Sequence, residues 1–173
     1  NIHKIKKGIS GIKFHRNFGY MYEYTAKVEE KILNEKFSKI GANKKVVYFR
    51  LSEIYLKQKR FVEAEKNLLV FLELSPDNAY ALHNLAQIYF ENDNPQALRY
   101  AEKAYQNAPD SPSVIDTYAL ALIKSGKESK AVELLEKAVS KFPATYTLYY
   151  RLASSYISVG KKNEAIGILR KAL

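Results

Sequence analysis

The sequence predicts an all-α protein, a solenoid of antiparallel helix pairs. Prolines recur at positions 76, 109 and 143, so they stand 33 and 34 residues apart. Between these prolines, apolar residues are spaced by three and four, as on one face of an α-helix, and do not alternate as they do in a strand. A period of this length is typical of repeat proteins built from stacked helical units.

Four repeat units follow from this alignment. They span residues 45–78, 79–111, 112–145 and 146–173, of which the second is one residue short and the fourth is truncated. Residues 1–44 form a basic N-terminal segment with a helix expected at about 17–40. That helix is interpreted as a degenerate repeat or as a lone helix that packs on the first unit.

The first helix of each unit is predicted from an apolar stripe. Its residues are Tyr48, Leu51 and Tyr55 in the first unit, Leu82, Leu85 and Tyr89 in the second, Ile115, Tyr118 and Leu122 in the third, and Tyr149, Leu152 and Tyr156 in the fourth. A small residue stands beside each stripe and allows the partner helix to approach closely: Ser52, Ala86, Ala119 and Ala153.

A turn and a second helix follow in each unit. Gly126 and Gly160 suit the left-handed position after a helix end. In the second unit, Asn94 is expected to cap the next helix and Pro95 to occupy its first turn. The second helices are expected to open with an alanine, namely Ala64, Ala97, Ala131 and Ala165. The recurring proline ends each unit because it cannot continue a helical hydrogen-bond ladder.

This pattern resembles the tetratricopeptide repeat over residues 45–173. The resemblance rests on LAQIY at 85–89, LASSY at 152–156, and the Gly126, Ala131 and Pro143 positions. It implies a right-handed superhelix that binds other proteins. Residues 92–138 resemble, more narrowly, the C-terminal repeats of bacterial tetratricopeptide lipoproteins of exopolysaccharide and protein-sorting systems. The chain is therefore expected to be part of a larger bacterial protein.

Composition excludes several classes of function. The 173 residues are 47% hydrophobic and include no cysteine, which rules out disulfides and thiolate chemistry. The sequence contains no run of about 18 uncharged apolar residues, which is the length that a membrane-spanning helix needs. The chain begins at Asn1, which indicates a fragment or a processed chain, and both a cytoplasmic and a periplasmic location stay open.

The net charge of +10 is concentrated near the N-terminus. Residues 1–45 carry 11 Lys and Arg against 4 Asp and Glu, a balance of +7. Aromatic residues are interleaved with these basic residues, so the segment could bind nucleic acid or an anionic membrane. A solubilising segment or a linker is the favoured interpretation, and binding to nucleic acid or to a membrane is considered unlikely.

The first helices are expected to line the concave side of the superhelix and to form a groove for a partner. Residues one position past each stripe would face that groove. They mix aromatic, apolar and hydrogen-bonding groups, which suits a peptide or an amphipathic helix. The alternative for each residue is that it packs against a neighbouring helix. The candidates are Phe49, Glu53, Tyr80, His83, Gln87, Asp116, Leu120, Tyr150, Ser154 and Ile157.

Two other kinds of site are argued against. Repeat proteins that bind a C-terminal carboxylate use Lys, Arg and Asn on their first helices, and only Asn84 fits among Phe49, Glu53, His83, Asn84, Ser113 and Thr117. No catalytic, cofactor or metal site is expected, because His3, His15 and His83 form no helical ligand pair. Gly8, Gly11 and Gly19 form no phosphate loop.

The function predicted from the sequence is a non-enzymatic scaffold that binds a peptide or helix of another protein. Two alternatives are retained. One is an adaptor for nucleic acid or anionic membranes through the basic segment. The other is a self-assembling structural module, because the last helix pair leaves an apolar face uncovered and a homo-oligomer could form through it.

Overall fold

The computed structural model describes residues 28, 31, 35 and 44–172 of the chain. The chain forms two compact units, residues 1–41 and 42–173. The predicted basic segment and most of the predicted helix at 17–40 lie outside the described residues. Val28, Lys31 and Glu35, the three described positions of that stretch, are helical.

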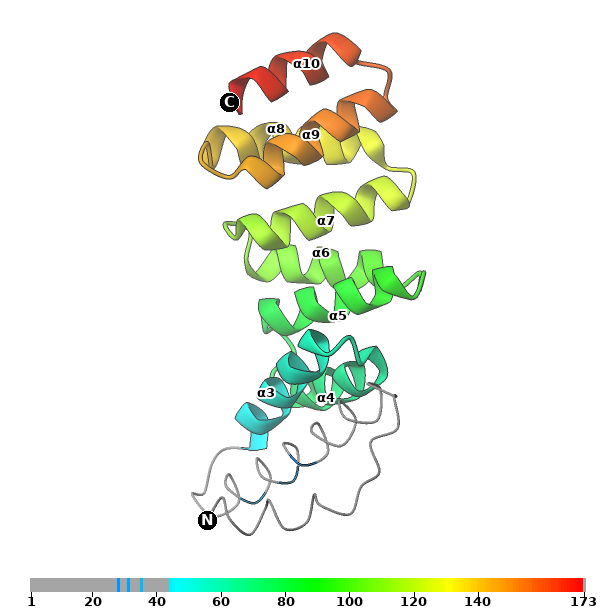
Figure 1. Cartoon of the computed structure of the whole chain (residues 1–173), viewed down its shortest axis with the longest axis vertical. Helices are drawn as coiled ribbons and strands as arrows, with labels where there is room; N and C mark the ends of the chain where they lie inside the picture. Colours follow the sequence, from blue (N-terminus) through cyan, green and yellow to red (C-terminus); the bar gives the residue numbers. More distant parts are fainter. Residues whose placement is uncertain (1–27, 29–30, 32–34, 36–43, 173) are drawn as a thin grey trace, which may run out of the picture. The chain divides into compact units, whose positions relative to one another are not determined.

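Within residues 44–172 the structure is a series of helix pairs (Figure 1). The first helices of the pairs are α3 (Lys44–Lys57), α5 (Ala79–Glu91), α7 (Pro112–Lys124) and α9 (Tyr146–Ser158). The second helices are α4 (Phe61–Leu74), α6 (Ala97–Asn107), α8 (Glu128–Lys141) and α10 (Lys162–Lys171). This part of the chain contains no strand, which confirms the predicted all-α class.

The pairs are stacked in the order of the sequence. Each second helix contacts the first helix of the next pair, and α5 contacts α7 as α7 contacts α9. In the view of Figure 1 the first helix α9 lies in front of the second helix α8. Because each pair contacts only its neighbours, the core is a continuous seam and not a central cluster. Among the described residues, no helix is long and apolar enough to cross a membrane.

Small side chains beside the apolar stripes are fully covered, as the sequence predicts. Ser52, Ala86 and Ala119 have no exposed surface, and Ala153 is 2% exposed. The buried Ser52 hydroxyl donates to the Phe49 carbonyl oxygen at 2.6 Å, which satisfies its polar group within its own helix. A side chain larger than alanine or serine at these positions would prevent the two helices from approaching closely.

The turns within the pairs share one backbone conformation. Gly126 and Gly160 have φ of +68° and +80°, which confirms the predicted left-handed positions. Lys59 and Asp93 hold the same place in the first two pairs, with φ of +57° and +49°. A side chain in this region is unfavourable by about 1 kcal/mol or more, so these two turns are less favourable than the glycine turns.

The second pair departs from its predicted start. Helix α6 begins at Ala97, so Pro95 precedes the helix and does not lie in its first turn. The Asn94 side-chain oxygen accepts from the Gln96 amide at 3.0 Å, just ahead of the helix. Helix α6 has 11 residues where α4 and α8 have 14, because Pro95 and Gln96 lie in the turn before it.

The expectation that every second helix opens with an alanine is correct only for α6. In α4, Ala64 is the fourth residue of the helix, and Ala131 and Ala165 hold the same place in α8 and α10. These alanines are buried because they face the first helix of their own pair, not because they begin a helix.

Tyrosine–glutamate hydrogen bonds join successive pairs. The hydroxyl groups of Tyr89, Tyr118 and Tyr156 donate to Glu65, Glu102 and Glu136 at 2.9, 3.3 and 2.6 Å. Each bond runs from a first helix to the second helix of the preceding pair. Partial burial, followed by the hydrogen bond to Glu136, raises the pKa of Tyr156 to about 12, and the pKa of Tyr89 is raised further for the same kinds of reason.

Candidate functional site

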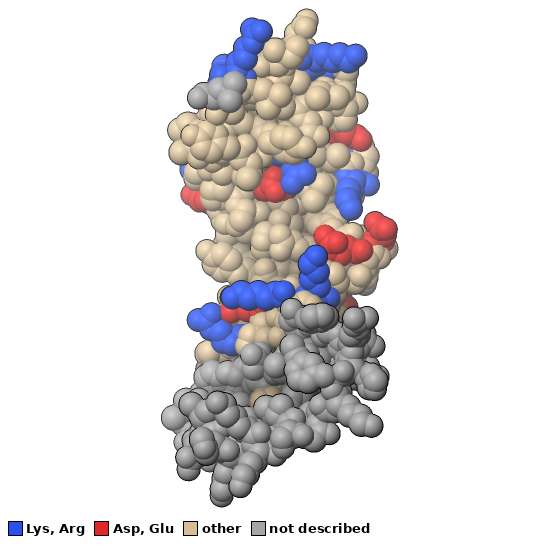
Figure 2. Space-filling model, viewed as in Figure 1, with Lys and Arg blue, Asp and Glu red and all other residues tan. Residues whose placement is uncertain are grey.

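The candidate site is the outward side of the first helices, called here the first-helix face. Figure 2 shows that this face is largely uncharged over α7 and α9, with an acidic and a basic group side by side in the middle of the view. The ten predicted residues come from all four first helices. Each helix turns a stripe of residues three and four positions apart toward this side.

Five of the ten predicted residues are exposed on the first-helix face. Tyr80, Tyr150 and Ile157 are 60%, 69% and 57% exposed. Gln87 and Ser154 are exposed as well. The other five, which are partly buried, are Phe49, Glu53, His83, Asp116 and Leu120. The face therefore combines prominent apolar side chains with shorter polar ones.

The two predicted residues on α3 have partners within the chain. The ring of Phe49 lies 5.0 Å from that of Phe71 on α4, centre to centre. Glu53 accepts a hydrogen bond from Arg50 at 2.8 Å. Packing against a neighbouring helix, the alternative weighed for every candidate, thus accounts for Phe49.

A polar cluster crosses the middle of the face. Arg151 on α9 makes two hydrogen bonds to the Asp116 carboxylate on α7, at 2.8 and 2.9 Å. Each side chain is 25% exposed. Burial lowers the pKa of His83 on α5, and the nearby Asp116 charge only partly opposes that shift. Its Nδ1 atom is buried and has no hydrogen-bond partner in the described part of the chain.

Sequence reasoning missed two residues of this face. Arg151 was overlooked because it follows Tyr150 directly, outside the stripe positions that were used. Tyr146, 67% exposed, lies one helical turn before Tyr150. The spacing of four between the two tyrosines was the signal that could have identified Tyr146.

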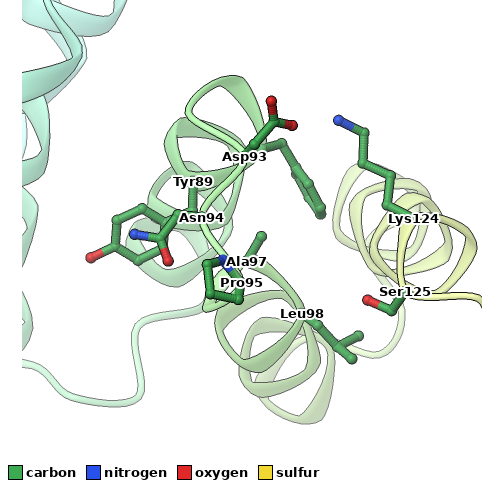
Figure 3. Close-up of a pocket in the computed structure, with 9 residues that line it drawn as sticks. Tyr89, Asp93, Asn94, Pro95, Ala97, Leu98, Lys124 and Ser125 are labelled. Carbon is green, nitrogen blue, oxygen red and sulfur yellow. The ribbon is translucent and has the colours of Figure 1, made fainter.

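A separate pocket lies beside the α5–α6 turn (Figure 3). Its volume is about 390 Å³, and its walls come from the end of α5, the turn, the start of α6 and the end of α7. Asp93 and Lys124 extend toward one another at its opening. The Lys124 ammonium lies 5.5 Å from the centre of the Phe90 ring. None of the ten predicted residues lines this pocket.

The metal, nucleic-acid and membrane expectations and the narrower family resemblance all stay predictions. Among the residues that the structure describes, no group of three or more His, Asp and Glu is arranged to hold a metal ion. The proposed nucleic-acid and membrane contacts belong to the basic segment, which lies outside those residues. The narrower resemblance to bacterial lipoproteins also stays a prediction.

Three families match the chain in sequence. Residues 46–78 and 68–98 each match a family described as tetratricopeptide repeat. Residues 91–172 match the family described as anaphase-promoting complex, cyclosome, subunit 3. Together these matches cover the predicted array. No curated protein sequence matches the chain.

Several solved structures share the fold. A crystal structure of MamA protein has a TM-score of 0.73 at 21% identity, over 87% of this chain and 82% of that one. A second MamA structure has the same TM-score at 20% identity, over 92% and 94%. YrrB, described as a TPR protein with an unusual peptide-binding site, has a TM-score of 0.71 at 15% identity, over 86% and 77%. These likenesses confirm the predicted solenoid fold.

Proposed function

Because the chain is a tetratricopeptide-repeat protein, we propose that it is a protein-interaction scaffold that binds a peptide or helix of a partner on its first-helix face. One observation carries this proposal: large apolar side chains stand exposed along the stripes of that face. Tyr80 and Tyr150 are both more than half exposed, so the fold leaves most of their apolar surface in contact with water. Apolar and aromatic residues of this kind supply most of the energy in protein interfaces.

The predicted groove residues have distinct roles in this proposal. Tyr80, Tyr150 and Ile157 act as apolar anchors, since a tyrosine offers a large contact area and one hydroxyl group. Gln87 and Ser154 supply hydrogen bonds to the backbone of the partner. Of the partly buried candidates, Leu120 adds apolar surface, and His83 and Asp116 shape the floor. Phe49 and Glu53 contribute at the margin because they already have partners on α4 and α3.

The mechanism is equilibrium binding without a chemical step. Tetratricopeptide-repeat families, and proteins with this fold, are typically scaffolds and not enzymes. The peptide-binding site named for YrrB supports a peptide partner for a fold of this type. The concave side of such a superhelix offers a long surface with which an extended or helical segment can align.

A random peptide library tests the proposal. Peptides of about 12 residues, displayed on phage, are selected against the chain, and their affinities are measured by fluorescence anisotropy. We expect the double substitution Tyr80→Ser, Tyr150→Ser to weaken binding at least about 10-fold, since each tyrosine is a candidate hot spot.

The matched control places equally exposed apolar residues on a second helix. Val62 and Leu74 on α4 are 76% and 53% exposed. The double substitution Val62→Ser, Leu74→Ser is expected to leave the affinity within about 2-fold. Selected peptides that bind the tyrosine variant as well as the wild type would contradict groove binding.

A second candidate function, self-association, is favoured by the surface of α10. Ile166 and Leu169 are 51% and 41% exposed. Their counterparts one repeat earlier, Val132 and Leu135, are 6% and 0% exposed because α9 covers them. We propose that a helix of a second copy can cover α10 in the same way.

Light scattering over a range of concentrations tests self-association. The expected result is a concentration-dependent dimer that Leu169→Glu abolishes, because the substitution places a charge in the buried contact. A monomer at every concentration, with wild-type and variant alike, would exclude this second function and leave peptide binding untouched.

A further inference from the structure

Three of the four first helices, α5, α7 and α9, have very few charged side chains, whereas α3 has five. Helix α9 has one, Arg151, and α5 has one, Glu91, which is its last residue. Helix α7 has Asp116 and Lys124, of which Lys124 is again the last residue. Charges at helix ends lie at the rim, so Asp116 and Arg151 are the formal charges within these stripes.

Asp116 and Arg151 neutralise one another. The guanidinium group spans both carboxylate oxygens, at 2.8 and 2.9 Å, which is the bidentate geometry of a strong ion pair. A charged ligand would have to break this pair to reach either group, and each is three-quarters buried. Burial lowers the pKa of His83, the third titratable group of the cluster, which favours its neutral form.

The exposed groups that remain are apolar or uncharged. On α9, Tyr146, Tyr150 and Ile157 are spaced by four and seven residues and so share one side of the helix. Ser154 stands between the last two on the same side. On α5, Tyr80 and Gln87 continue this surface toward the next stripe. Figure 2 shows the uncharged area over α7 and α9.

From this surface, and on the premise of the proposed function, we infer that the partner segment is itself uncharged where it meets α5, α7 and α9, and that it presents aliphatic or aromatic side chains to the α9 stripe. Complementarity requires this, because a charged group on the partner would lose its water without gaining an opposite charge. An acidic tail, which needs free lysines and arginines, does not fit.

The composition of the selected library peptides tests the inference. Selection is carried out in about 0.3 M salt, which suppresses long-range attraction to a chain of net charge +10. The peptides are expected to be rich in Leu, Phe, Tyr and uncharged polar residues. Replacing two uncharged polar residues that contact the first-helix face in a selected peptide by Glu, or by Lys, is expected to weaken its binding at least about 5-fold. The affinity of the unsubstituted peptide should change less than about 2-fold between about 50 and 500 mM salt.

A designed charge on the face sharpens this test. Ser154→Lys places an unpaired cation between Tyr150 and Ile157, at an exposed position that the core does not need. It is expected to weaken binding of the uncharged peptide and to strengthen binding of its Glu version by about 3–10-fold. Ser140→Lys on α8, also exposed, is the matched control and is expected to change neither.

The outcomes separate the two claims. Peptides that lose binding in the Tyr80→Ser, Tyr150→Ser variant, yet are rich in Asp and Glu and release at high salt, would overturn this inference and leave groove binding intact. Peptides indifferent to the tyrosine substitutions would overturn groove binding and this inference together. Failure to enrich any peptide would count against both.

Discussion

Helix α9 carries one charged residue among thirteen, whereas its neighbour α8 carries six among fourteen. Both helices bury one side in the same core cluster, through Leu148 and Leu152 in α9 and through Leu135 and Val139 in α8. Burial therefore explains the apolar inner sides of both. It does not explain the outer side of α9, where Tyr150 and Ile157 are exposed. The difference separates a surface that only faces water from a surface suited to a partner.

The largest expected effect concerns the buried core, to which first helices and second helices both contribute. Leu85 on α5 and Leu135 on α8 are both fully buried. Substituting either by alanine leaves a cavity and is expected to lower the free energy of unfolding by about 2–5 kcal/mol, measured by urea denaturation followed by circular dichroism. The half-exposed Leu74 on α4 is the control, with an expected loss of at most about 0.5 kcal/mol. A small loss for Leu135→Ala alone would show that second helices contribute less to the core.

The next effect concerns the charges that the first-helix face does contain. Asp116→Asn or Arg151→Gln leaves the other member of a three-quarters buried pair without its partner. Each is expected to lower the free energy of unfolding by about 1–3 kcal/mol, between the values for exposed and fully buried pairs. The double variant should lose clearly less than the sum of the two. Additive losses would mean that the pair contributes nothing to the joining of α7 and α9.

A smaller effect concerns the tyrosine–glutamate hydrogen bonds between first helices and second helices. The pKa of Tyr156 is raised to about 12 in the folded chain, against about 10 in the unfolded chain. The stabilisation it gives is therefore complete below pH 10 and is lost as the pH rises toward 12. At neutral pH, Tyr156→Phe is expected to lower the free energy of unfolding by about 0.5–1.5 kcal/mol. Denaturation at several pH values should show this difference vanish by pH 12, and a constant difference would contradict the assignment.

The smallest effect concerns the exposed tyrosines. Tyr80→Ser and Tyr150→Ser are expected to change the free energy of unfolding by no more than about 0.5 kcal/mol, because neither side chain is covered by the fold. Thermal and urea denaturation measure this directly. A loss above about 2 kcal/mol would assign these residues to packing and would remove the contrast between the two outer surfaces.

Much of the fold could be predicted by aligning the units. The prolines recur at a nearly constant spacing, and the small residues at 52, 86, 119 and 153 hold the same place in each unit, so the sequence reveals both directly. The late start of α6 could not be predicted, because proline is compatible with the first turn of a helix and nothing in the sequence excludes Pro95 from α6.

The details of the candidate site were harder to predict. The pair of Asp116 and Arg151 joins residues 35 positions apart, and the choice of residue in two different units decides whether it forms. A pattern derived from one unit contains no information on such a pair. The exposure of Tyr146 was missed for a related reason. This residue stands at the first position of its helix, before the apolar stripe begins, so the stripe does not indicate which side of the helix it occupies. The ten groove residues stay a prediction until binding is measured.

The tyrosine–glutamate bonds have a consequence for how the chain assembles and how it yields to force. They link residues only 24, 16 and 20 positions apart, so every junction can close soon after its own two helices have formed. Folding can then begin at any junction and spread to its neighbours. When the chain is pulled from its ends, the pairs should peel away one after another at modest force, because within residues 44–172 the helices of each pair contact those of the neighbouring pairs.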